Sequence, residues 1–292
     1  MSVVTGIRPL VTGSAGLLGR VVARRLEERF PATVSATREF LDLEDFWRLR
    51  AELERIDPSV VVNCAGYSDV DGCERNPDRA FRENRDAAVH LARACRAIGA
   101  RLIHISTDYV FDGRSEGPYR EDDACLPLQV YGESKWEGEQ EAMREHPDTL
   151  LIRTSFLFGP GRNTFIDRAL DSARAGKPVR AVLDWVNAPT YTVDLAAAIE
   201  TLLQAGARGV MHYSNLGGCS KFEFAREVLR QAGFDPNLVE PVRRDDLPLP
   251  AARPERTVLD LGRFTELTGA APRPWPRAVE EYLRNGAVPP AP

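Results

Sequence analysis

The chain has little of what marks a secreted, metal-binding or membrane protein. Its five cysteines are scattered and form no Cys-x-x-Cys pair, and its four histidines do not combine with carboxylates at metal-like spacing. No uninterrupted apolar run approaches about 20 residues, and the N-terminus lacks the pattern of a signal peptide. We therefore expect a cytoplasmic protein with reduced thiols, no metal site and no membrane span.

The charge of the chain is nearly balanced, with a small acidic excess. There are 38 Lys and Arg residues against 43 Asp and Glu residues, so the formal net charge is −5. This balance argues against general nucleic-acid binding, which favours basic surfaces. The 292 residues, of which 43% are hydrophobic, are enough for one large domain or two closely packed ones.

Short apolar segments alternate with segments of helical periodicity along the first half of the chain. Strands are predicted at 7–12, 33–37, 58–66, 101–107 and 149–155, with helices at 17–30, 44–55, 77–98 and 131–145 between them. This alternation predicts an α/β fold, a Rossmann-like doubly wound parallel sheet. Pro9 in the first segment implies either that the start of this strand is trimmed or that the strand has an edge-like start, because proline cannot donate to a ladder.

The second half of the chain is less regular. A helix is expected at 194–204, a strand at 210–214 and another helix at 222–232. We predict a dinucleotide-binding domain over residues 1–155, to which 188–214 returns. A smaller, interleaved substrate-binding part is expected over 156–187 and 215–292.

A glycine-rich loop follows the first predicted strand. In TGSAGLLG (12–19), Gly13 permits a tight turn, Gly16 lets the backbone approach a pyrophosphate, and Gly19 allows a helix to pack closely on the strand. The helix that follows presents its N-terminus to the phosphates. A glycine-rich turn without a ligand has the same appearance, so the loop becomes informative only together with the residues downstream.

The end of the second strand bears on the choice between NAD and NADP. Arg38 can pair with a 2′-phosphate, which favours NADPH, whereas Glu39 would favour NADH if it occupied that place. Asp42 and Leu43 are expected to border the adenine. Cys64 and Ala65 either line the nicotinamide half or are simply small core residues at a strand end.

Thr107, Tyr131 and Lys135 carry the chemistry that the sequence predicts. Tyr131 and Lys135 are four residues apart, so they lie on one face of a helix. A nearby ammonium favours the phenolate and lowers a tyrosine pKa toward the working pH. Thr107, at the end of the fourth strand, can bind the same substrate oxygen. After a phosphate-binding loop, this set indicates transfer of a hydride and a proton to a carbonyl.

These motifs together resemble the extended short-chain dehydrogenase/reductase superfamily, and within it the dTDP-4-dehydrorhamnose reductase family. The similarity covers almost the whole chain and is carried, in order, by TGSAGLLG, VVNCAGYSDVDGCE, STDYVFDG, YGESKWEGE, LIRTSFLFG, APTYTVDLA and ARPERTVLD. It implies NAD(P)H-dependent reduction of the 4-keto group of dTDP-4-dehydro-6-deoxy-L-mannose. It also implies a homodimer. A magnesium site between subunits occurs in the family and cannot be placed here.

The resemblance assigns a role to each residue of the expected site. Tyr131 is the proton donor, Lys135 holds the nicotinamide ribose, and Thr107 with Asp108 contacts the sugar. Ser14 and Gly16–Leu18 lie at the cofactor phosphates. The remaining expected contacts are Gly66 and Tyr67 at the nicotinamide, and Ser68, Phe156 and Arg253 at the substrate. Arg253 is either the contact to the nucleotide diphosphate, which suits a guanidinium, or simply a loop arginine in solvent.

Three residues depart from the family pattern. Phe156 stands where the family often has a stacking tryptophan, and it lacks the indole N–H. Trp185 and Asn187 stand where glutamine and glycine are expected. Phe156 and the altered segment at 184–187 together motivate an alternative in which the substrate is another nucleotide-linked 4-keto-6-deoxy sugar. A further alternative is a non-catalytic regulatory subunit resembling that of methionine adenosyltransferase. Tyr109 after Asp108, in place of glutamate, argues against a dehydratase.

Overall fold

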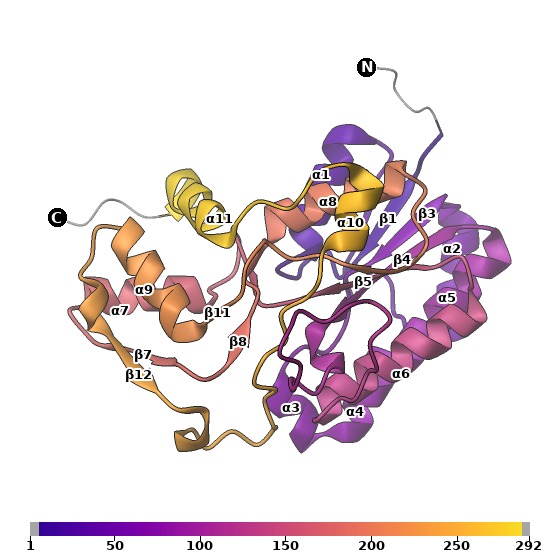
Figure 1. The fold of residues 1–292 in the computed structure, drawn as a ribbon. Helices are drawn as coiled ribbons and strands as arrows, with labels where there is room; N and C mark the ends of the chain where they lie inside the picture. The colour runs from indigo at the N-terminus through magenta and orange to yellow at the C-terminus, as the bar shows by residue number, and fades with distance from the viewer. Residues whose placement is uncertain (1–5, 288–292) are drawn as a thin grey trace.

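A six-stranded parallel sheet forms the centre of the computed structural model, which describes residues 6–287. The strands run in the order β10-β5-β4-β3-β1-β2, so the predicted doubly wound fold is confirmed. Figure 1 labels β5, β4, β3 and β1 of this sheet. Leu10 in β1 lies opposite Val34 in β2 and Val61 in β3. The bounds are β1 Pro9–Thr12, β2 Val34–Ala36, β3 Val60–Asn63, β4 Arg101–Thr107, β5 Leu150–Thr154 and β10 Gly209–His212.

Pro9 is the first residue of β1, where the missing N–H costs least. The side chains of the sheet then alternate between two apolar cores, as the period of a strand requires. Val11 and Val62 pack with α1 (Gly19–Arg29) and α8 (Thr192–Gln204) on one face. Leu10 and Val61 pack on the other face, which is covered by α2 (Phe46–Ile56), α5 (Ala87–Ile98) and α6 (Val130–Glu145).

The helix that the sequence predicts at 77–98 is present with these bounds, but it is not α-helical throughout. α4 (Pro77–Phe81) passes into a π-helical turn, η1 (Arg82–Asp86), before α5 begins. A π-turn inserts one residue into the α-helical register, and such turns are frequent at functional sites. The insertion turns the Asn84 side chain inward, where it is buried. A short helix, α3 (Val70–Arg75), precedes α4 and was not predicted.

A third apolar core lies beside the sheet, among the helices on the left in Figure 1. α7 (Phe165–Arg174), α9 (Lys221–Gln231) and α11 (Trp275–Tyr282) pack around Phe158, Phe224 and Val279. β7 (Val179–Val182) pairs with β12 (Val239–Val242) in parallel. The remaining short elements are β6 Leu157–Phe158, β8 Val186–Asn187, β9 Thr190–Tyr191, β11 Cys219–Ser220, α10 Gly262–Thr268, η2 Asp108–Val110, η3 Pro236–Leu238, η4 Arg244–Asp246 and η5 Leu283–Ala287. The proposed division into two domains stays a prediction.

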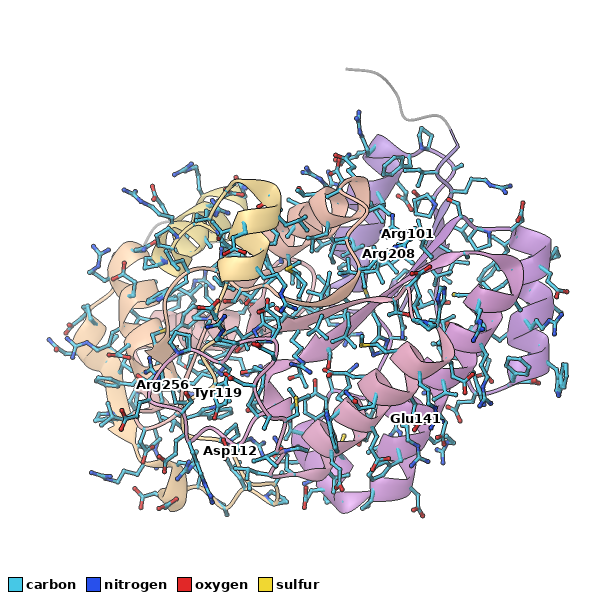
Figure 2. All side chains as sticks on the ribbon, turned by 45° about the vertical axis from the view of Figure 1, so that its right-hand side comes forward. Arg101, Asp112, Tyr119, Glu141, Arg208 and Arg256 are labelled. Atoms are coloured by element: carbon cyan, nitrogen blue, oxygen red, sulfur yellow. The ribbon has the colours of Figure 1, made fainter. Side chains whose placement is uncertain are left out.

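The two ends of β4 have different surroundings. At its amino end, the Arg101 guanidinium donates to the carbonyl oxygens of Leu203 (3.0 Å) and Ala207 (3.1 Å), near Arg208 (Figure 2). At its carboxyl end lies Thr107, where parallel sheets bind ligands.

All five cysteines are free. Among residues 6–287, no helix is both long and apolar enough to cross a bilayer.

Candidate active site

The glycine loop after β1 has the geometry that its sequence predicts. Gly13 adopts a left-handed φ of 63°, and a Cβ there would lie 2.8 Å from backbone atoms of Cys64 and Ala65. A Cβ on Gly19 would lie 2.1 Å from the Gly13 carbonyl oxygen. α1 begins directly after this loop, and no side chain caps its N-terminal N–H groups. The N-terminus of α1 therefore favours an anion beside this loop, although the N–H groups of Ser14, Gly16 and Arg20 already donate to backbone carbonyls.

A cleft of about 690 Å³ runs along the carboxyl ends of the strands, a volume typical of a ligand site. It brings together most of the residues expected from the sequence. Ser14, Gly19 and Arg253 do not line it. The expected residues that do line it are Gly13, Gly16, Leu17, Leu18, Arg38, Asp42, Leu43, Cys64, Ala65, Gly66, Tyr67, Ser68, Thr107, Asp108, Tyr131, Lys135 and Phe156.

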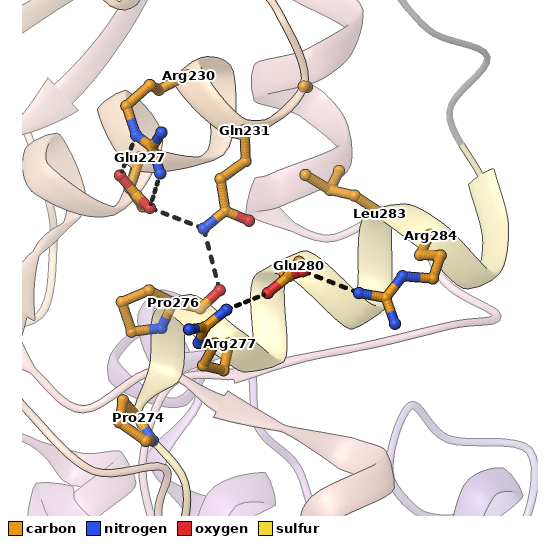
Figure 3. Close-up of a pocket in the computed structure, with 10 residues that line it drawn as sticks. Glu227, Arg230, Gln231, Pro274, Pro276, Arg277, Glu280, Leu283 and Arg284 are labelled. Carbon is orange, nitrogen blue, oxygen red and sulfur yellow. Dashed lines mark hydrogen bonds and ion pairs between the residues drawn. The ribbon is translucent and has the colours of Figure 1, made fainter.

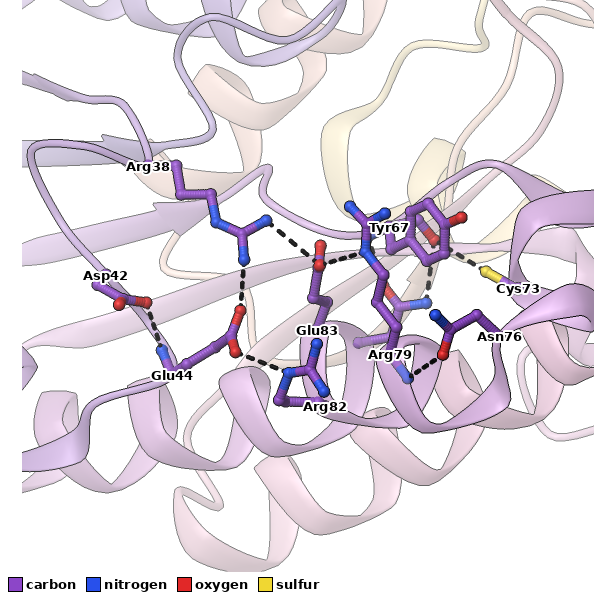
Figure 4. A network of polar contacts seen from close by, with 10 residues as sticks. Arg38, Asp42, Glu44, Tyr67, Cys73, Asn76, Arg79, Arg82 and Glu83 are labelled. Atoms are coloured by element: carbon purple, nitrogen blue, oxygen red, sulfur yellow. Dashed lines mark hydrogen bonds and ion pairs between the residues drawn. The ribbon is translucent and has the colours of Figure 1, made fainter.

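Arg38 lies at one end of the cleft within a network of ion pairs (Figure 4). Its guanidinium lies 2.5 Å from a carboxylate oxygen of Glu44 and 3.2 Å from one of Glu83. Arg82 contacts the other oxygen of Glu44 at 2.8 Å but does not line the cleft. Glu39 lies outside the lining, so Arg38 is the residue of this pair that faces the cleft.

Tyr131 and Lys135 project from the first turns of α6 toward the end of β4, where Thr107 lies. The Lys135 ammonium donates to the Ile105 carbonyl oxygen at 2.7 Å. Burial lowers the pKa of Lys135 to about 8. Burial raises the pKa of Tyr131 above its ordinary value, while the Thr107 hydroxyl acts in the opposite direction. The pKa of Tyr131 is thus raised, whereas the sequence predicted that the nearby Lys135 would lower it.

Asp108 is buried beside Thr107 and accepts hydrogen bonds from three hydroxyl groups. Thr107 donates at 3.2 Å and Ser155 at 2.7 Å, and Thr257 also donates. Burial raises the pKa of Asp108 to about 6, although these hydrogen bonds act in the opposite direction. Asp108 thus joins the ends of β4 and β5 to the C-terminal segment that contains Thr257.

Asn84 is a site residue that helical periodicity missed. Its amide oxygen accepts from the Tyr67 N–H at 2.8 Å, and its amide nitrogen donates to the Tyr67 carbonyl at 3.1 Å and to the Ser134 hydroxyl at 3.0 Å. The π-turn directs this side chain between the loop after β3 and helix α6. Asn84 therefore fixes the Tyr67 loop against the helix that carries Tyr131.

Lys221, the first residue of α9, is the other residue that the sequence analysis missed, because no motif marks it. Its ammonium lies 2.8 Å from the ring centroid of Phe156 and 5.7 Å from that of Trp185. Phe156 has a left-handed φ of 36°, which is rare for a non-glycine residue and is characteristic of functional sites. Trp185 Nε1 and Asn187 Oδ1, on the same wall of the cleft, are buried without a hydrogen-bond partner.

Arg253 lies outside the cleft lining. Its guanidinium forms an ion pair with Asp71 at 3.0 Å, donates to the Ala251 carbonyl oxygen at 2.8 Å and lies 5.7 Å from the Trp185 ring. In the free protein, Arg253 is therefore paired within the protein and supports Trp185.

A larger hollow of about 880 Å³ lies between α9 and α11, away from these residues (Figure 3). Its charged groups pair with one another. Glu227 contacts Arg230 at 2.6 Å, and Glu280 contacts Arg277 at 3.0 Å. These ion pairs engage the charged side chains that line the hollow. Within residues 6–287, no His, Cys, Asp and Glu side chains cluster as metal ligands.

Comparisons with known proteins agree with this geometry. The family model described as the RmlD substrate binding domain matches residues 7–288. A dTDP-4-dehydrorhamnose reductase of Streptomyces griseus is 39% identical over 281 residues, covering 94% of this chain and 92% of the relative. A dTDP-4-keto-6-deoxy-D-glucose reductase of Streptomyces niveus is 36% identical over 275 residues, covering 94% and 96%.

Among solved structures, a dTDP-4-dehydrorhamnose reductase of Bacillus anthracis in complex with NADP superposes with a TM-score of 0.92 at 31% identity. The superposition covers 97% of this chain and 100% of that one. Identity above 30% across nearly the whole of both chains agrees with the match of the family model. The chain belongs to the dTDP-4-dehydrorhamnose reductase family.

Proposed function

We propose that this protein is an NAD(P)H-dependent dTDP-4-dehydrorhamnose reductase, which reduces the 4-keto group of dTDP-4-dehydro-6-deoxy-L-mannose to give dTDP-L-rhamnose. One observation carries the proposal. Thr107, Tyr131 and Lys135 line the same cleft as the glycine loop after β1. A phosphate-binding loop and an acid–base group thus share one site, as reduction of a carbonyl requires.

The residues of the cleft fit a nicotinamide dinucleotide. The backbone between Gly13 and Gly19 and the uncapped N-terminus of α1 suit the pyrophosphate. Arg38 suits the 2′-phosphate of NADPH, and NADH is the alternative cofactor. When bound, the reduced cofactor supplies the hydride. Cys64, Ala65 and Gly66 line the cleft near Lys135, which suits the nicotinamide half.

Each catalytic side chain then has one task. Tyr131 donates a proton to the substrate oxygen, and burial keeps that proton on the phenol until charge develops on the oxygen. The Thr107 hydroxyl orients the same oxygen, and Lys135 holds the nicotinamide ribose. Ser68, Asp108 and Phe156 contact the sugar. The assignment of Arg253 to the diphosphate requires its ion pair with Asp71 to open.

A second candidate substrate is another nucleotide-linked 4-keto-6-deoxy sugar. Phe156, Trp185 and Asn187 form a wall of the cleft that departs from the family pattern. The relative from Streptomyces niveus is named for dTDP-4-keto-6-deoxy-D-glucose, which differs in stereochemistry. The non-catalytic alternative is less well supported, because a regulatory subunit has no need of an intact Thr107, Tyr131 and Lys135 set in a cleft.

Oxidation of NADPH, followed by absorbance, tests the proposal with two substrates supplied separately. We expect a kcat/KM for dTDP-4-dehydrorhamnose at least tenfold above that for dTDP-4-keto-6-deoxy-D-glucose. The reverse order would assign the second candidate, and no oxidation of NADPH or NADH with either sugar would contradict the function. A homodimer and a cytoplasmic location stay predictions; sedimentation velocity tests the first.

A further inference from the structure

The loop between β6 and α7 lies against the glycine loop after β1, and Arg20 in the first turn of α1 joins the two. The Arg20 guanidinium donates to the carbonyl oxygens of Ala15 at 3.0 Å and Gly16 at 3.2 Å, both in the glycine loop. It also donates to the Gly161 carbonyl oxygen at 2.7 Å, in the loop between β6 and α7. Gly161 has a left-handed φ of 95°, and a Cβ there would collide with the Arg20 side chain. This close contact fixes the position of the next residue, Arg162.

Arg162 is exposed and lines the cleft beside the glycine loop. Its guanidinium donates to the Ala15 carbonyl oxygen at 3.4 Å, which is long for a hydrogen bond. Within residues 6–287 it makes no other hydrogen bond and no ion pair, whereas Arg38 in the same cleft pairs with Glu44 and Glu83. A guanidinium carries five N–H donors and keeps its charge in proteins. Arg162 therefore presents an unpaired cation to the cleft.

The glycine loop uses part of its own backbone internally, so a phosphate group there needs further donors. The Ser14 N–H donates to the Ala36 carbonyl oxygen at 3.2 Å, and the Gly16 N–H donates to the Gly13 carbonyl oxygen at 2.8 Å. These N–H groups are engaged before any ligand binds. Arginine matches phosphate oxygens in both charge and donor geometry. Arg162 is thus suited to bind the phosphate oxygens that the backbone of the loop does not reach.

We propose that Arg162 binds the pyrophosphate of the dinucleotide cofactor, from the loop that faces the glycine loop. Its contact with Ala15 places the guanidinium beside the loop that is suited to the pyrophosphate. The inference deepens the proposed function and rests on it. Arg38 and Arg162 then bind different phosphates of the same cofactor. The 2′-phosphate occurs only in NADPH, whereas the pyrophosphate occurs in NADPH and NADH, so Arg162 contributes equally to the affinity for both.

Fluorescence titration of the intact protein with NADPH and with NADH tests the proposal. Arg162→Gln should weaken both cofactors by the same factor, about tenfold, because a charge-assisted hydrogen bond to a group that they share is lost. Arg162→Glu should weaken both further, because it places a negative charge beside the phosphates. A purely structural role of the side chain would give equal losses in the two variants. Equal losses, unchanged dissociation constants in Arg162→Glu, or a loss confined to NADPH would each overturn the proposal.

Arg180→Glu is the matched control, because Arg180 is exposed on β7 outside the cleft lining. It changes the net charge as Arg162→Glu does and should alter neither dissociation constant by more than about twofold, since solvent screens a distant charge. Calorimetric titration with dTDP tests the other source of a diphosphate, the nucleotide sugar. Arg162→Gln should leave dTDP binding unchanged, and a loss for dTDP with intact cofactor binding would overturn the proposal.

The wild-type titrations separate this inference from the proposed function. A wild-type protein that binds neither NADPH nor NADH would contradict the reductase assignment itself. Normal binding by the wild type, together with unchanged binding by Arg162→Gln and Arg162→Glu, would contradict only the role of Arg162.

Discussion

The Ser155 hydroxyl donates a hydrogen bond to the Asp108 carboxylate across 2.7 Å, joining the ends of β5 and β4. Thr257, from the C-terminal segment, donates to the same carboxylate oxygen. The carboxylate is nevertheless costly to ionise, because burial raises its pKa to about 6. Asp108 therefore ties these segments together at the expense of stability near neutral pH.

Asp108→Asn should change the pH dependence of stability. Because the folded-state pKa is raised from 3.8 to about 6, the contribution of Asp108 to stability is fully present below pH 3.8 and is lost as pH rises through 6. The variant lacks this loss. Relative to the wild type, its free energy of unfolding should therefore rise by up to about 3 kcal/mol between pH 4 and pH 7, because each unit of pKa shift corresponds to about 1.4 kcal/mol. Urea unfolding across this range measures the difference, and a constant difference would show that Asp108 does not titrate.

Arg38→Ala should weaken NADPH binding by about tenfold or more and change NADH binding by less than about twofold. The reason is the loss of a charge-assisted hydrogen bond to the 2′-phosphate. Arg82→Ala is the matched control, because it removes a positive charge from the same network but lies outside the cleft lining. Fluorescence titration measures both dissociation constants. Equal losses for the two cofactors in Arg38→Ala would mean that Arg38 does not read the phosphate.

Lys221→Met should raise the KM for the nucleotide sugar by roughly tenfold while leaving the dissociation constant of the cofactor unchanged. The Lys221 side chain lies against Phe156 in the lining of the cleft. Burial holds its pKa well below the ordinary value, and a bound anion would favour its charged form. Lys177→Met serves as the control, because Lys177 is exposed after α7. An unchanged KM would place Lys221 among residues that only support Phe156.

Sequence patterns predicted the central sheet and most of the residues that line the cleft. Residues 101–107 and 131–145 were placed within one residue of β4 and α6, because a buried parallel strand and a helix of 16 residues have strong local signals. The end of such a strand fixes where Thr107 lies, and the helical period fixes how Lys135 lies beside Tyr131. The local sequence pattern was therefore sufficient to place a residue wherever a single helix or strand determines its position.

The residues that were missed depend on contacts between distant segments. The π-turn at Arg82–Asp86 forms around Asn84, whose partners Tyr67 and Ser134 are 17 and 50 residues away in sequence. Lys221 reaches the cleft only because α9 packs against Phe156. Arg253 was expected at the ligand, but its local sequence could not reveal the ion pair with Asp71. Hydrophobic periodicity shows which face of a helix or strand is buried, but it does not show which distant segment packs against that face.

Tyr131→Phe gives the most direct test of the central claim. The variant removes the hydroxyl that donates the proton and leaves the ring and the cofactor contacts in place, so turnover of dTDP-4-dehydrorhamnose should fall by about 10²–10⁴-fold. The dissociation constant for NADPH should stay within about twofold of the wild-type value. Turnover close to that of the wild type, in a folded variant that binds NADPH, would contradict the role of Tyr131 and the account of the site built on it.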